Sequence, residues 1–489
     1  MTEAKRPQLQ LLETSAVKQI IDEALVILMD VGAFVENGEG LKLLAEAGAQ
    51  VDHTQNRAHI PPNLVEKCLK TAPSHIKVYD REGESALDLR EDMVHFNPGS
   101  AALRIFDPQL GKPRDAFTKD LVNLARLVEE LHHFKAQSTA LISSDVPEEM
   151  ADRYRLYISL IYGTKPVITG TFAKQGFAVM HQMLAAVRGG ADQLREKPLA
   201  IFDCCPSPPL KWSDLTCQSL IDCARSGIPA ELVSMPLTGA TSPVTLAGAV
   251  VQHAAENLSG IVIHQLAQPG APIIYGGSPA CFDMRKGTAP MGAIETMMID
   301  VAYSQVGKHL KLPTHTYMAL SDAKILDAQA GLESGMGAIL AALAGINVVS
   351  GPGMLDFESC QSLEKLVIDN EICGMALRLA EGIALREKPL AMNILKKIGQ
   401  IDHFLADPHT LQWFRQEACF PGPAIDRGTL GEWDEKGRLT ATQRAHQEVE
   451  RILAGAEPKT LPAEIATELR SILLADAKKY GLEKLPVSI

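Results

Sequence analysis

Residues 313–335 read PTHTYMALSDAKILDAQAGLESG, and this stretch contains one complete structural unit. Its first eight residues are rich in threonine and apolar side chains, which is typical of a buried strand. From Ile325 onward, alanine and leucine recur at helical spacing. Five residues between the two parts (His315, Tyr317, Ser321, Asp322 and Lys324) bring polar groups to the end of the strand. The stretch therefore predicts a strand, a polar loop and a helix, with Ser321 or Asp322 as the helix cap.

The same pattern occurs eight times in one unbroken series. Short runs rich in Val, Ile, Thr and aromatic residues each precede a helical segment, as parallel βα units do. The eight predicted strands span 93–101, 134–142, 165–172, 198–206, 229–237, 271–279, 312–320 and 346–354. Eight consecutive units are the number that closes a (β/α)8 (TIM) barrel. A doubly wound open sheet is the main alternative, but the chain has neither a G-x-G-x-x-G nor a G-x-x-x-x-G-K-[ST] phosphate turn.

Two further regions flank the predicted barrel. Residues 1–92 contain short helices and hairpins and are predicted to form an N-terminal cap. Residues 93–387 form the barrel in this α/β prediction, and residues 388–489 form a C-terminal extension. The extension is expected to pack on the barrel, because it carries too many large apolar groups for a solvated linker. These groups are Phe404, Leu411, Trp413, Phe414, Phe420 and Trp433.

Composition limits the possible partners and the compartment. The formal net charge of −12 over 489 residues disfavours a nucleic-acid binder or a binder of anionic membranes. No run of about 18 apolar residues predicts a membrane span, and the first residues lack the apolar core of a signal peptide. The nine cysteines show no Cys-x-x-Cys pair and no disulfide framework. We therefore expect a cytoplasmic protein with reduced thiols.

In a TIM barrel the active site lies at the C-terminal ends of the strands and in the loops that follow them. His315 is the one histidine at such a position, which disfavours a metal site, and Lys165 begins its strand at the opposite end, which disfavours a Schiff base. The lining is therefore predicted to consist of hydroxyls, amides and aromatic rings around one histidine. It suits a small cation without N–H groups, which aromatic rings hold by cation–π attraction. The candidate binding residues are Phe96, Asn97, Phe172, Ser234, Tyr275, Arg285, His315, Tyr317 and Phe357.

Three separated motifs carry a resemblance to a known family. They are CFDMRKGTAPMGAIE (281–295), LSDAKILDAQAGLES (320–334) and a tail that contains HFLADPHTLQWFRQE (403–417) and PAIDRGTLGEWDEKG (423–437). In this order over one barrel, they resemble the trimethylamine methyltransferase superfamily. Archaeal trimethylamine enzymes of that superfamily carry pyrrolysine near the end of the seventh strand, whereas this chain has ordinary residues from Tyr317 to Ser321. It thus resembles the members without pyrrolysine, which demethylate quaternary amines such as glycine betaine.

The resemblance implies a reaction, an acceptor and roles for the candidate residues. A methyl group would pass from a quaternary amine to the Co(I) of a corrinoid on a separate partner protein, with no cofactor bound covalently and no acid, base or nucleophile from this chain. The Asp-x-His-x-x-Gly cobalamin motif is absent, and a homo-oligomer is expected. Phe172, Tyr275, Tyr317 and Phe357 would form the cage, and His315 or Arg285 would bind a betaine carboxylate. Asn97 and Ser234 would then orient the substrate.

Several alternatives stay open at this stage. The substrate could be carnitine, γ-butyrobetaine or proline betaine instead of glycine betaine. A barrel lyase or hydrolase that uses a metal or a Schiff base is a second class of enzyme. A barrel that binds betaine without catalysis is a third possibility, because the proposed enzyme is itself mainly a binding pocket.

Overall fold

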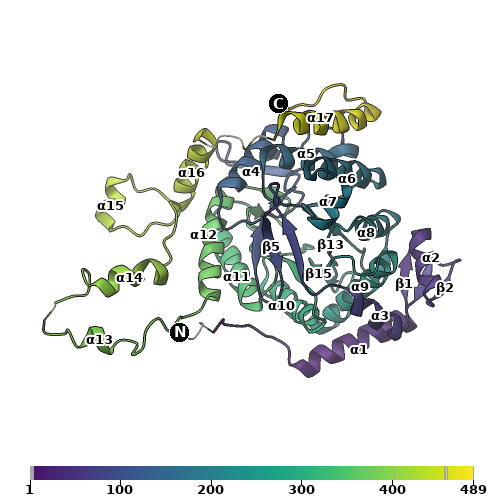
Figure 1. The fold of residues 1–489 in the computed structure, drawn as a ribbon, viewed down its shortest axis with the longest axis horizontal. Coiled ribbons are helices and arrows are strands. Elements are labelled where there is room, and N and C mark those ends of the chain that lie inside the picture. The colour runs from purple at the N-terminus through teal and green to yellow at the C-terminus, as the bar shows by residue number, and fades with distance from the viewer. Residues whose placement is uncertain (1–4, 401, 456–458, 460, 488–489) are drawn as a thin grey trace.

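The computed structural model describes residues 5–400, 402–455, 459 and 461–487, and its centre is a barrel of eight parallel strands (Figure 1). Each strand lies within one of the eight predicted runs, so the predicted (β/α)8 fold is confirmed. The strands are β6 (His95–Asn97), β9 (Gln137–Ser138), β10 (Val167–Gly170), β11 (Ala200–Cys204), β13 (Ala230–Leu232), β15 (Ile273–Gly277), β17 (Thr314–Tyr317) and β18 (Val348–Ser350). The pairing runs in sequence order from β9 to β18 and then to β6. A bridge from Phe96 to Phe134 closes the circle, and the Lys135 amide donates to the Phe96 carbonyl at 2.9 Å.

Eight large helices surround the strands, as the sequence pattern predicts. They are α4 (Thr118–Glu130), α5 (Ala151–Tyr162), α6 (Lys174–Arg188), α8 (Asp214–Ser226), α9 (Leu246–Ala267), α10 (Ile294–His309), α11 (Ala328–Ala344) and α12 (Leu363–Ala380). A short helix, α7 (Ala191–Glu196), and a 3-10 turn, η1 (Glu148–Met150), lie between them. The predicted cap of α11 is wrong, because its N-cap is Asp327, whose carboxylate accepts from the amides of Gln329 and Ala330. Ser321 and Asp322 belong to the preceding loop.

Short strands build the loops at the C-terminal ends of the barrel strands. They are β7 (Arg104–Asp107), β8 (Lys112–Asp115), β12 (Lys211–Trp212), β14 (Leu237–Thr238), β16 (Ala280–Cys281), β19 (Met354–Leu355) and β20 (Cys360–Gln361). The order β19-β20-β7-β8 joins the loop after the eighth strand to the loop after the first. This small sheet gives the rim of the barrel a fixed backbone on that side.

The N-terminal region covers the bottom of the barrel and one side. It consists of α1 (Thr14–Asp30), β1 (Ala33–Val35), α2 (Gly38–Glu46), β2 (Gln50–Asp52), β3 (Arg57–His59), α3 (Pro62–Thr71), β4 (Ile76–Tyr79) and β5 (Ser85–Leu89). The β4–β5 hairpin closes the N-terminal end of the barrel, where its apolar side chains form one cluster with residues from five barrel strands or the segments beside them. The cluster comprises Ile76, Val78, Leu87, Leu89, Ala136, Ile168, Ile201, Ile274 and Val348. The bottom of the barrel is thereby sealed against water, and only the opposite end remains for a site.

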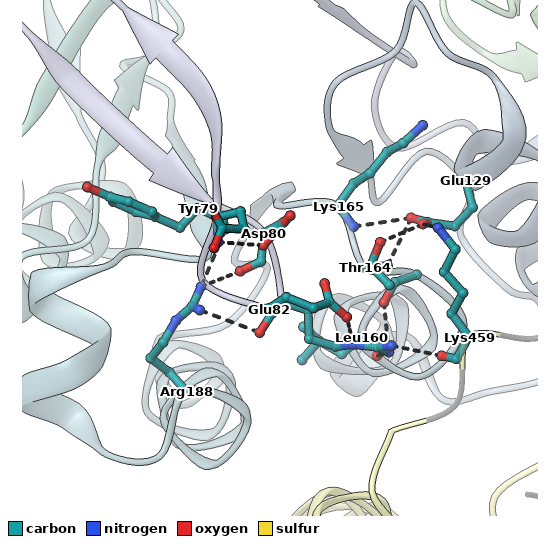
Figure 2. Close-up of polar contacts among 12 residues, drawn as sticks. Tyr79, Asp80, Glu82, Glu129, Leu160, Thr164, Lys165, Arg188 and Lys459 are labelled. Carbon is teal, nitrogen blue, oxygen red and sulfur yellow. Dashed lines mark hydrogen bonds and ion pairs between the residues drawn. The ribbon is translucent and has the colours of Figure 1, made fainter.

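Figure 2 shows how the tip of this hairpin is fixed to the barrel. Arg188 of α6 donates to the Asp80 carbonyl at 2.7 Å, and Arg81 donates to the Gly163 carbonyl at 3.1 Å. Nearby, the Glu129 carboxylate accepts from the Thr164 amide at 2.9 Å and from the Thr164 hydroxyl at 2.8 Å. The two arginine contacts fix the hairpin to the barrel, and the Glu129 contacts hold the segment before β10 on which Arg81 rests, at the end of the barrel that is remote from any active site.

The C-terminal region packs on the barrel in part. It contains α13 (Met392–Leu395), α14 (Pro408–Glu417), α15 (Leu430–Glu435), α16 (Ala441–Gly455), α17 (Ala463–Ala477) and the 3-10 turn η2 (Lys478–Tyr480). Helix α16 packs on α12, and α17 packs on α6. By contrast, α13, α14 and α15 stand away from the barrel (Figure 1), and Leu411 and Phe420 are 65% and 64% exposed. Leu411, Phe414 and Phe420 are thus exposed, whereas Phe404, Trp413 and Trp433 are half-buried, and the packing of the whole extension on the barrel stays a prediction.

Candidate active site

Side chains that point into the barrel change character from bottom to top. Because successive residues of a strand face opposite sides, His315 and Tyr317 of β17 point inward, as do Asp203 of β11 and Glu231 of β13. Asp203 and Glu231 are register partners on neighbouring strands. The layer below them is apolar and belongs to the cluster under the hairpin. The upper layer is thus a buried polar site at the C-terminal end of the barrel, where TIM-barrel enzymes hold their catalytic groups.

Asp203 and Glu231 form a buried pair of carboxyl groups. The Tyr317 hydroxyl donates to Asp203 Oδ2 at 3.4 Å, whereas neither Glu231 oxygen has a donor among the described residues. Burial raises the pKa of Asp203 to about 6. Burial and the neighbouring Asp203 carboxylate raise the pKa of Glu231 well above its ordinary value. At neutral pH Asp203 is therefore mostly ionised, whereas burial and the Asp203 charge favour the neutral form of Glu231, so the negative charge of the pair lies chiefly on Asp203.

His315 lies beside this pair as a neutral ring. Its Nε2 is 3.1 Å from Glu231 Oε1 and 3.3 Å from the Ser350 hydroxyl, which in turn meets the Asn97 amide at 2.9 Å. Burial lowers the pKa of His315 to about 3, so the imidazole carries no charge near neutral pH. It packs edge-on against Tyr317, with ring centroids 5.0 Å apart. A Cβ atom on Gly276 would lie 2.8 Å from His315 Cβ, so the glycine makes room for this ring.

Arg155 brings a positive charge to the same end of the barrel from α5. Its Nη1 donates to the Thr139 carbonyl at 2.6 Å, and its guanidinium carbon lies 4.4 Å from the centre of the Phe172 ring. Burial lowers the pKa of Arg155 to about 10, which leaves it charged at neutral pH. The charges of Asp152 and then Asp203 oppose this lowering of the pKa, but neither acid makes an ion pair with Arg155 within 4.0 Å among the described residues. Its Nε has no hydrogen-bond partner in the part of the chain that the structure describes.

The loop after β18 adds an acid and an aromatic ring at the rim. Asp356, Phe357 and Glu358 have φ angles of 50°, 55° and 63°, a run of left-handed residues that L-amino acids adopt at a cost. Lys324 Nζ lies 3.7 Å from the centre of the Phe357 ring. Burial, together with the charges of Asp203 and other acids, raises the pKa of Glu358 well above its ordinary value. The strained loop thus brings a third, half-buried acid near the Asp203–Glu231 pair.

The structure brings some of the predicted site residues together. Asn97, His315 and Tyr317 line the interior of the barrel, and Phe172 and Phe357 contact cationic side chains near its C-terminal end. A role for these five in substrate binding stays a prediction.

The other four predicted residues lie elsewhere. Phe96 packs in the core outside the strands, and the Ser234 hydroxyl donates to Glu256 of α9. Tyr275 packs behind the sheet against His253 and Tyr303, with ring centroids 5.5 Å and 6.4 Å away. Arg285 is 87% exposed at its side chain and binds Asp283 at 2.8 Å. The alternation of strand side chains explains the first three positions, because each residue faces the helices.

Sequence reasoning missed the charged half of the site. The lining predicted from hydroxyls, amides and aromatic rings lacks Arg155, Glu231 and Glu358. Glu231 had a usable signal, since it is the one charged residue inside the apolar strand PAELVSMPL. Arg155 lies in a helix whose other charged residues are also buried, so its inward orientation is visible only in the fold.

The fold and the buried polar layer define an α/β-barrel enzyme whose site lies at the C-terminal end of the strands. Comparison with known proteins identifies the kind of enzyme. Residues 1–479 match the family model described as trimethylamine methyltransferase (MTTB), and the chain belongs to this family of methyltransferases. The predicted resemblance to the trimethylamine methyltransferase superfamily is thereby confirmed.

Curated relatives extend over nearly the whole chain. The trimethylamine methyltransferase of Desulfitobacterium hafniense is 32% identical over 94% of this chain and 92% of its own. That of Methanosarcina barkeri is 33% identical over 95% of both chains. The glycine betaine methyltransferase of Desulfitobacterium hafniense is 29% identical over 98% of this chain and 99% of its own. Among solved structures, the monomethylamine methyltransferase of Methanosarcina barkeri gives a TM-score of 0.47 at 11% identity, over 96% of this chain and 94% of that one.

Proposed function

We propose that this enzyme transfers a methyl group from a betaine, most simply glycine betaine, to the Co(I) corrinoid of a separate partner protein. In this reaction the carbon–nitrogen bond breaks, the methyl group passes to cobalt, and the bonding electron pair returns to nitrogen. The product is a neutral tertiary amine, so no proton has to be supplied to the leaving group. The contribution of this chain is to position the cation and to exclude water.

The observation that carries the proposal is the separation of charge at the buried end of the barrel. The Asp203 carboxylate supplies a negative charge beside Tyr317, and Arg155 supplies a positive charge that no acid among the described residues neutralises by contact. A betaine carries the same two charges with the opposite arrangement. Its quaternary nitrogen would lie next to Asp203 and Tyr317, and its carboxylate would lie next to Arg155.

Arg155 replaces the two residues first expected to bind the carboxylate. His315 is neutral near pH 7, and Arg285 is an exposed partner of Asp283. Arg155 is buried, already oriented by Thr139 and Phe172, and retains an Nε donor without a partner in the described chain. A buried guanidinium with a free N–H group binds a carboxylate in the geometry that Arg prefers.

The aromatic contribution is smaller than a full cage. Phe172 lies under Arg155 and Phe357 under Lys324, so each ring already has a cation over one face. Tyr317 is the ring that lies beside both carboxyl groups and His315. The quaternary nitrogen would therefore be held chiefly by the Asp203 carboxylate and by Tyr317, with the other two rings forming the rim.

Two features favour betaines over trimethylamine as substrates: the ordinary residues at the position where the resemblance implies pyrrolysine, and the positive charge of Arg155. Residues Tyr317 to Ser321 are ordinary where the resemblance implies pyrrolysine. Trimethylamine has no carboxylate, so it would leave the buried Arg155 guanidinium without an anion in contact. Carnitine, γ-butyrobetaine and proline betaine share the two charges of glycine betaine and are the alternative substrates. A barrel that binds betaines without transferring methyl groups is the remaining candidate.

A substrate panel tests the proposal. The purified enzyme is mixed with cob(I)alamin or with a corrinoid protein, and methylcobalamin is followed by its absorbance for each of six amines. The panel comprises glycine betaine, proline betaine, carnitine, γ-butyrobetaine, tetramethylammonium and trimethylamine. We expect at least one betaine to exceed the last two in kcat/KM. Preference for trimethylamine, or binding of betaines without methyl transfer to either acceptor, would contradict the proposal.

A further inference from the structure

An apolar band runs across the outer faces of three consecutive barrel helices. On α11 the exposed residues Leu332, Met336 and Ile339 recur at spacings of four and three, so they share one face. The neighbouring helices α10 and α12 also carry exposed apolar residues. The band is defined as Ile294 and Met298 on α10, Leu332, Met336 and Ile339 on α11, and Met375 and Leu379 on α12. Leu332 is 72% exposed. Single exposed apolar residues are ordinary, but a group of them on adjacent, packed helices is typical of an interaction surface.

A second uncovered apolar surface belongs to the segment that leaves α12. Residues 383–435, here called the arm, contain α13, α14 and α15. Their exposed large apolar residues are Ile383, Leu385, Leu390, Met392, Leu395, Ile398, Leu405, Leu411, Phe414, Phe420 and Leu430. No other part of the described chain gathers so many.

The arm is folded and attached at its base, although its apolar residues are exposed. Its own contacts include the Trp413 indole on Glu387 at 3.0 Å and the paired rings of Phe414 and Phe420 at 6.0 Å. Polar contacts tie it to α12, where Arg378 donates to the Glu417 carbonyl at 3.0 Å and lies 3.9 Å from the Glu417 carboxylate, and the Gly422 amide donates to Glu371 at 2.7 Å. These contacts are polar, so they hold the arm in place without covering its apolar groups.

The attachment places the arm beside the band. On α12 the anchor residues Glu371 and Arg378 alternate with the band residues Met375 and Leu379. Figure 1 shows α13 to α15 standing off the barrel on the side of α11 and α12. One side of the molecule therefore presents two apolar surfaces, one on the barrel and one on the arm, that do not cover each other.

We infer that the arm of one copy packs on the apolar band of a second copy of this chain. Because the same chain carries both surfaces, a symmetric pair buries two arms and two bands at once. Charge allows this contact, since Arg386 pairs with Glu417 and Lys397 pairs with Asp407 within the arm. These pairs neutralise part of the charge of the arm, which lowers the repulsion between two negatively charged chains. This inference concerns assembly and stands whatever the substrate is.

Sedimentation velocity of the full-length protein tests the inference with two variants and a control. One variant changes the band (Leu332→Asp with Met336→Asp), and the other changes the arm (Leu405→Asp with Leu411→Asp). All four side chains are exposed, so the fold should be unaffected, and circular dichroism checks this. The control, Val244→Asp, alters a residue that is 64% exposed in a loop outside both surfaces. We expect the unaltered chain and the control to associate, and each variant to weaken association by at least about tenfold.

Mixing the two variants tests which surfaces meet. An arm-to-band contact leaves one intact contact in a mixed pair, because the band variant still has its arm and the arm variant still has its band. The mixture should then associate more tightly than either variant alone. A monomeric unaltered chain, variants that associate as the control does, or a mixture without recovery would overturn the inference. Loss of corrinoid-protein binding in a chain that is monomeric alone would assign these surfaces to that protein instead.

Discussion

Replacing Arg155 by Gln should weaken the use of betaines while sparing cations that lack a carboxylate. The guanidinium is buried and retains an unpaired Nε, so a substrate carboxylate would gain charge-assisted hydrogen bonds there. Such bonds are worth about 1.5–3 kcal/mol, which corresponds to roughly a 10- to 150-fold loss in kcat/KM. Tetramethylammonium should lose little, because the change removes a positive charge near its binding position.

The assay compares kcat/KM for glycine betaine and tetramethylammonium in the Arg155→Gln, Arg155→Lys and Arg285→Gln variants. The lysine variant retains the charge but not the fork, so it should fall between the unaltered enzyme and Arg155→Gln. Arg285 is exposed and bound to Asp283, so its variant should behave like the unaltered enzyme. Because the Thr139 carbonyl loses its donor in Arg155→Gln, thermal unfolding is measured in parallel. Equal losses for both substrates in a folded variant would refute the reasoning.

Three further predictions concern the charge pair, the barrel wall and the hairpin. Asp203 has a folded pKa of about 6 against an ordinary value of 3.8, so its ionisation destabilises the fold as pH rises between these values. Asp203→Asn should therefore raise stability above pH 6 by about 2–3 kcal/mol, and it should lower activity because it removes the anion proposed to hold the substrate cation. Unchanged melting temperatures at pH 7 would contradict this. Gly276→Ala should lower stability by about 1–3 kcal/mol and impair turnover, because the new Cβ would lie 2.8 Å from both His315 Cβ and the Leu232 carbonyl oxygen. Normal turnover at an unchanged melting temperature would argue against a crowded site. Leu87→Ala in the β4–β5 hairpin should lower the free energy of unfolding, measured in urea, by about 2–5 kcal/mol and leave the KM for betaine unchanged. A raised KM would show that the hairpin affects the site.

The barrel was predictable because its signal is local and repeated. Each strand is a short apolar run bounded by turn residues, and eight of them alternate with amphipathic helices. What the pattern lacks is the direction of each side chain. Tyr275 and His315 both stand near a strand end, but Tyr275 faces the helices and His315 faces the interior. An error of one residue in the alignment of a strand exchanges the residues assigned to the barrel interior with those assigned to the helices. Placement near a strand end therefore could not distinguish Tyr275 from His315.

The charged groups of the site escaped prediction for a different reason. Arg155 comes from a helix and reaches the buried polar layer only because α5 packs beside β10. Glu358 depends on three consecutive left-handed residues that no local propensity favours. The exposure of apolar groups on the arm could not be predicted, because apolar composition predicts burial without saying against what surface. In each case the deciding quantity is a contact between distant segments.

The most direct test of the account is a single-turnover reaction with glycine betaine labelled with ¹³C in its methyl groups and the corrinoid protein in its Co(I) state. The account predicts one equivalent of ¹³C-methyl cobalt and one equivalent of dimethylglycine per corrinoid, with a large loss of both in the Arg155→Gln variant. Unchanged betaine under conditions in which trimethylamine is consumed would contradict it.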